Sequence, residues 1–101
     1  MSDQIRVILF KEGDLWVGQC LEYDIGAQAR DLDELRARLT VAIEAERRES
    51  IERCGSAFAG IAQAPPYFHE LWEKRSGNFE PRYPTKLRDG DNVTLELAIA
   101  A

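Results

Sequence analysis

The 101-residue sequence is poor in the residues on which many functional sites depend. Its two cysteines and one histidine are too few for the roughly four nitrogen or sulfur ligands of a zinc site. It has no glycine-rich phosphate loop and no Gly-x-Ser-x-Gly motif. No apolar run approaches the ~20 residues of a membrane span, and no basic stretch before an apolar one marks an export signal. We therefore expect a cytoplasmic protein without membrane association, bound metal or cofactor.

The few residues suited to covalent catalysis lie far apart in the sequence. Cys20, Cys54 and His69 would have to meet in space to form a nucleophile and base pair. We expect both cysteines to be free thiols in a reducing compartment. Paired carboxylates are not expected either, since residues 4–10 contain none and the last predicted strand contains only Glu96. We predict no catalytic residues and no enzymatic activity, with a thiol enzyme using Cys20, Cys54 or His69 as a remaining alternative.

The excess of negative over positive charge comes entirely from the first third of the chain. The formal net charge is −5, and residues 1–34 carry eight acids against three bases, whereas the remainder carries ten of each. Acidic surfaces repel nucleic acid and attract basic proteins, although ordinary solubility explains the same imbalance. We predict that a small basic protein binds around the first hairpin and its exit. The predicted contact residues are Glu12, Asp14, Trp16, Glu22, Tyr23 and Asp24.

Residues 76–91 contain two prolines and two glycines without periodicity, which predicts a long loop. Aromatic and basic residues alternate in this loop. Proteins that bind single-stranded nucleic acid use such residues, because the bases stack on the aromatic rings and the basic side chains contact the backbone. Acidic residues in the same stretch dilute its charge, so we do not expect direct nucleic-acid binding. The aromatic and basic residues concerned are Phe79, Arg82, Tyr83, Lys86 and Arg88.

Alternating apolar residues predict strands over 4–10 and 15–20, joined by a turn at Glu12-Gly13-Asp14. A weaker strand is expected over 25–30. The spacing of Asp31 and Glu34 matches a helix N-terminal capping box, and Gly55 is a natural stop. The sequence therefore predicts one long helix from about residue 31 to 54.

Residues 92–101 alternate clearly and predict a final strand. A crossover connection should place it parallel to the first strand and beside it. We predict an α+β fold: a two-layer sandwich of order β-β-β-α-(helical and loop insert)-β, with the long helix on one face of a mixed sheet. The single domain would have its core at 4–54 and 92–101, and an insert at 55–91.

Two helical segments offer surfaces for self-association. The long helix should be longer than the strands, so its charged second half should overhang the sheet. We also expect a short helix over 67–75, because Pro65-Pro66 suits a helix start. As an alternative function we consider a structural homo-oligomer or a small-ligand-binding module. The predicted subunit contacts are Ile51, Phe68, Leu71 and Trp72.

The order of these elements resembles the HicB-like antitoxin family. The resemblance rests on the strand IRVILF, the strand LWVGQC and the acidic-capped helix DLDELRARLTVAIEAE, and covers residues 4–50 and 92–100. One departure is the segment 21–24, Leu-Glu-Tyr-Asp, where the family usually has a Pro-Gly turn. Residues 55–90 have no counterpart in the resemblance.

The resemblance implies a degenerate ribonuclease-H-like fold without catalytic carboxylates. Family members neutralise a small, basic, RNA-cleaving toxin by covering its surface, and an acidic first third would suit such a partner. Many also carry a C-terminal DNA-binding module that represses their own operon. We expect no such module after the last strand, and therefore no operator binding.

Overall fold

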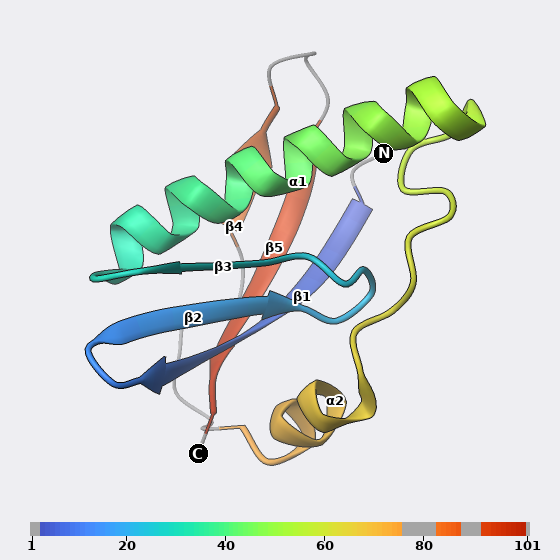
Figure 1. The fold of residues 1–101 in the computed structure, drawn as a ribbon. Coiled ribbons are helices and arrows are strands. Elements are labelled where there is room, and N and C mark those ends of the chain that lie inside the picture. The colour runs from blue at the N-terminus through green and yellow to red at the C-terminus, as the bar shows by residue number, and fades with distance from the viewer. Residues whose placement is uncertain (1–2, 76–82, 88–91, 101) are drawn as a thin grey trace.

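The computed structural model describes residues 3–75, 83–87 and 92–100. In these ranges, five strands form one sheet with a helix on either side (Figure 1). The elements are β1 (Asp3–Glu12), β2 (Leu15–Cys20), β3 (Gly26–Ala29), α1 (Leu32–Cys54), α2 (Pro66–Glu73), β4 (Tyr83–Lys86) and β5 (Asn92–Ile99). The strand order is β3-β2-β1-β5-β4.

The central strands follow the sequence prediction. β1 and β2 form an antiparallel hairpin in which Glu12 pairs with Leu15. Its two-residue turn begins at Gly13, whose φ of +64° belongs to a region that favours glycine. β5 runs parallel to β1 and beside it, with Ile5 opposite Leu95, which confirms the predicted crossover.

The prediction of a loop over residues 76–91 is wrong in one part. Tyr83–Lys86 forms β4, which pairs antiparallel with β5 at the sheet edge. Pro84 cannot donate a backbone hydrogen bond, and proline is tolerated in edge strands for that reason. A four-residue strand with a central proline lacks the alternating pattern on which sequence prediction depends. The sheet therefore has at least one more strand than expected.

The long helix α1 begins and ends where the sequence predicts. Asp31 Oδ1 accepts a hydrogen bond from the backbone N–H of Glu34 (2.8 Å), and Gly55 ends the helix with φ +78°. Leu35, Leu39 and Ile43 lie buried along the side that faces the sheet. The same side of the second half is also covered, at Arg47 and Ser50, so that half is not wholly solvated as expected.

Two apolar clusters, one on each face of the sheet, hold the layers together. The larger cluster lies between the sheet and α1, and Ile5, Val7 and Leu95 are among its members. The smaller one lies under α2, where Trp72 packs with Ile8, Leu21 and Ala98. The protein is thus an α+β fold with a long helix on one face of a mixed sheet, and α2 covers part of the other face. Neither helix is long and apolar enough to cross a membrane, as far as the described residues show.

Candidate functional site

The predicted partner-binding residues separate into two groups at opposite ends of β2. Glu12, Asp14 and Trp16 belong to the β1–β2 hairpin end, whereas residues 22–24 form the turn that leaves β2. Six strand residues span roughly 20 Å, so one small contact patch does not hold both groups. The two ends therefore have to be considered as separate surfaces.

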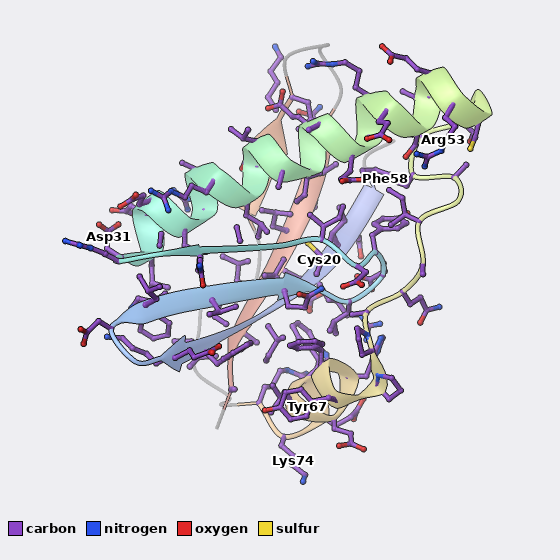
Figure 2. The ribbon with its side chains drawn as sticks, in the orientation of Figure 1. Cys20, Asp31, Arg53, Phe58, Tyr67 and Lys74 are labelled. Atoms are coloured by element: carbon purple, nitrogen blue, oxygen red, sulfur yellow. The ribbon has the colours of Figure 1, made fainter. Side chains whose placement is uncertain are left out.

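The first group lies beside the start of α1. Trp16 pairs with Ala29 across the β2–β3 ladder, which brings the hairpin turn next to the chain that enters the helix. Asp31 points outward at this end (Figure 2). We call this surface the acidic end. Its exposed acids are Glu12, Asp14, Asp31 and Asp33.

Basic side chains neutralise part of the negative charge of the acidic end, but not all of it. Lys11 lies over the Trp16 ring, with Nζ 5.4 Å from the ring centroid, and Arg30 is the only other exposed base between residues 11 and 33. Glu34 forms an ion pair with Arg38, one turn further along α1. Four exposed acids against Lys11, Arg30 and the half-buried Arg36 leave a net charge of −1 on this surface. The half-buried Trp16 packs on the larger apolar cluster and supplies a partly exposed ring in the same area.

A leucine-lined hollow opens next to one of these acids, Asp33. It has a volume of about 230 Å³ and lies between the first turns of α1 and the sheet. Asp33 and Arg36 stand at its rim. Its apolar lining consists of Leu9, Leu32, Leu35, Leu39 and Leu97. The sequence did not indicate this hollow, because leucines of a helix and of distant strands border it only after folding.

The second group holds the fold together. Glu22 Oε2 accepts a hydrogen bond from Arg6 Nε (2.6 Å), and Oε1 accepts one from the Arg6 backbone N–H (2.7 Å). Tyr23 stacks on Phe58, with ring centroids 4.4 Å apart. Phe58 is buried below the second half of α1, so this stack ties the β2–β3 turn to the segment that follows the helix (Figure 2).

Asp24 belongs to the same junction. Its backbone N–H donates to the Ala62 carbonyl (2.7 Å), and its Oδ1 accepts from Gln19 Nε2 (3.0 Å). Phe58 adopts φ +63°, a strained conformation for a residue with a side chain, which the surrounding contacts hold in place. We call this surface the junction end. Arg6 offsets the charge of Glu22, whereas Asp24 is exposed and accepts from a neutral amide, so this end has a weaker attractive field than its two acids imply.

The three residues considered for thiol catalysis do not come together. Cys20 faces α1 in the larger cluster, whereas His69 is on α2, which packs on the opposite face of the sheet. Burial, and to a lesser degree the charge of Glu22, raises the pKa of Cys20 to about 12, so its thiol stays protonated at neutral pH. Cys54 is exposed at the far end of α1.

His69 borders a wide, shallow hollow of about 400 Å³ together with Gln63, Glu70 and Glu73. This hollow brings the histidine near carboxylates of its own helix only. Across the described parts of the chain, no three histidine, cysteine or acidic side chains gather in a way that could hold a metal ion.

The residues predicted for a subunit contact lie in two different environments. Trp72 is 5% exposed and packs on the chain's own sheet, with Phe68 and Leu71 beside it. The guanidinium carbon of Arg75 lies 4.8 Å from the Trp72 ring centroid, which adds a cation–π contact. This helix face is thus already covered within the chain, whereas Ile51 on α1 is 40% exposed.

The predicted aromatic and basic loop lies only partly within the described residues. Phe79, Arg82 and Arg88 lie outside the described residues, and the structure gives only the backbone of Tyr83, in β4. Lys86 ends β4 and is exposed.

Comparison with known proteins gives no family for this chain. No family model, no curated protein and no solved structure matches it.

Proposed function

We propose that the protein is a non-enzymatic binding module that masks a small basic protein through its acidic end. The observation that carries this proposal is the leucine-lined hollow beside exposed acids. Protein interfaces combine an apolar anchor in a central pocket with a polar rim, and complementary charge speeds the encounter of the partners. The acidic end offers these features on one surface, whereas the acids of the junction end are bound within the chain.

The size of the hollow favours a protein side chain over a free small ligand. Small-molecule sites are usually clefts of ~300–1,000 Å³. At about 230 Å³, the hollow suits one large apolar side chain of a partner. Asp33 at the rim, with Asp31 and the hairpin acids beyond it, would then meet basic residues around that side chain. This role is the one expected of a HicB-like antitoxin, and we propose it for the cytoplasm, where the free thiols of Cys20 and Cys54 are stable.

The test compares two charge-reversed proteins as baits in a lysate of the source organism. One bait carries Glu12→Lys and Asp14→Lys at the acidic end. The matched control carries Glu70→Lys and Glu73→Lys, which make the same change in net charge on α2. We expect the unchanged protein and the control to retain one small basic protein at low salt and to release it as salt rises. The acidic-end bait should not retain it.

A second variant separates the hollow from the charges. Leu32→Trp places a larger side chain at the edge of the hollow without changing the net charge. We expect it to weaken binding of the same basic protein. Equal retention of that protein by the acidic-end bait and by Leu32→Trp would refute the proposed surface. Retention of nothing but further copies of the chain would refute the masking role.

A further inference from the structure

The outward side of α1 carries an apolar side chain that the described chain does not cover. Val41 is 60% exposed and lies on the opposite side of the helix from the buried residues Leu39 and Ile43. Ala37 and Ala45 are also exposed, one turn before and one turn after it. Figure 1 shows the sheet on one side of α1 and no other described element on the other. An exposed branched apolar side chain between two alanines permits close approach of another helix.

The surface beside Val41 has the shape that receives a side chain from a second helix. Val41, Glu44, Ala45 and Arg48 border a hollow of about 100 Å³. These four residues have the spacing i, i+3, i+4, i+7. In packed helix pairs, a side chain of one helix enters the hole formed by four residues of the other, and four residues at this spacing form such a hole.

The charges on one flank of this face are arranged for a second copy in the opposite direction. Glu34 pairs with Arg38 near the start of α1, and Glu49 pairs with Arg53 near its end, with 2.8 Å between Arg53 Nη1 and a Glu49 oxygen. All four side chains are well exposed. Arg38 and Glu49 are equally distant from the midpoint of the stretch from Glu34 to Arg53, and so are Glu34 and Arg53 themselves.

A two-fold axis at that midpoint places opposite charges against each other. Antiparallel helices related by such an axis bring the same flank of both copies together. Arg38 of one copy then faces Glu49 of the other, and Glu34 faces Arg53, so the two ion pairs of each helix join into networks of four charges. In a parallel arrangement, this flank would instead lie against the opposite flank of the partner helix, so these four charges would not meet their counterparts in the other copy.

We propose that the protein forms a symmetric dimer through the outward faces of two antiparallel α1 helices, with Val41 of each copy in the hollow of the other. The charge register supports this packing, because it brings Val41 of one copy opposite the stretch 44–48 of the other. Arg38 has a fixed position on this flank, because Nη1 donates to the Gln28 carbonyl (2.9 Å) and Nη2 pairs with Glu34. This dimer uses none of Glu12, Asp14 and Leu32, the residues that are changed to test the masking role, so the two tests can fail separately.

Sedimentation equilibrium of the full chain over a wide concentration range tests the proposal. We expect a monomer–dimer equilibrium whose dissociation constant rises about tenfold or more in Val41→Lys, because a central apolar side chain becomes charged. Tyr67→Lys is the matched control, since Tyr67 is 58% exposed but lies on α2. It should leave the dimer unchanged. Circular dichroism should show native helix content in both variants, because both positions are at the surface.

Charge exchange then tests the antiparallel register. Arg38→Glu and Glu49→Arg should each weaken the dimer, because each places like charges across the axis. The double variant carrying both changes should recover most of the affinity. If these charges acted only within their own helix, the double variant would recover no affinity relative to the single ones. A chain that stays monomeric at every concentration, or a dimer that Tyr67→Lys disrupts and Val41→Lys does not, would overturn the proposal.

Discussion

The two ends of β2 carry similar residues and use them differently. Each end has two acids and one aromatic ring within a few positions. At the junction end, Glu22 binds Arg6 and Tyr23 stacks on Phe58, so these side chains hold two segments of the chain together. At the acidic end, the acids are exposed and the ring of Trp16 is only half-buried.

The difference shows that an excess of acids along a sequence overstates the charge available to a partner. A carboxylate that accepts hydrogen bonds from an arginine is close to neutral as seen from outside. Exposed carboxylates around a hairpin turn and a helix start keep their field, which attracts a basic surface over about a Debye length. Changes at the junction end should therefore affect stability first, and changes at the acidic end should affect binding first.

The largest effect is expected for Phe58→Ala at the junction end. Removal of a buried aromatic ring costs about 3–5 kcal/mol, since packing is lost and a cavity is left. Here the ring also stacks on Tyr23 and packs in the larger cluster. Urea denaturation followed by circular dichroism should show this loss in the free energy of unfolding. A loss below about 1 kcal/mol would mean that the junction is not a structural contact.

The buried thiol beneath the junction end provides a pH test. The pKa of Cys20 is raised to about 12 in the folded protein from an ordinary value near 9, so the unfolded chain loses this proton first. The protonated thiol therefore stabilises the fold fully below pH 9, and this contribution is lost as pH rises from 9 towards 12. In urea titrations, the unfolding free energy of the unchanged protein should fall more steeply above pH 9 than that of Cys20→Ala. Equal slopes for the two proteins would contradict the burial of this thiol.

A matched pair of substitutions compares the two ends directly. Glu22→Gln should destabilise the protein by about 1 kcal/mol, because it weakens two hydrogen bonds to Arg6 at a partly exposed site. Glu12→Gln, the same chemical change on the exposed hairpin, should alter stability by less than ~0.5 kcal/mol. Thermal and urea denaturation of both variants under one buffer would measure the difference. If the two values are equal, the distinction between the ends fails.

The sequence predicted the elements whose signals are local. Asp31, Glu34 and Gly55 are cap residues, and they mark both ends of α1 without information from elsewhere in the chain. The hairpin and the alternating pattern of residues 92–99 are local in the same sense. β4 was missed because an edge strand of four residues containing Pro84 has no such signal.

The candidate sites depended on contacts between distant residues, and the sequence predicted them only in part. It identified the acids but grouped Glu22 with Glu12, since nothing local shows that Glu22 accepts hydrogen bonds from Arg6, sixteen positions earlier. The leucine-lined hollow likewise needs Leu9 and Leu97 to meet the start of α1. The apolar side of α2 was correctly recognised as apolar, but its partner is the sheet of the same chain.

The smallest effect on stability is expected for the variant designed to abolish binding. Glu12→Lys combined with Asp14→Lys changes two exposed side chains, and surface substitutions usually shift stability by less than ~0.5 kcal/mol. Replacement of acids near Asp31 and Asp33 by bases also reduces repulsion at this end, which offsets part of any loss. Urea denaturation of this double variant should therefore overlay that of the unchanged protein, while the basic partner is no longer retained. A loss above about 1 kcal/mol would show that the hairpin acids support the fold, as the junction acids do, and the contrast between the two ends would no longer hold.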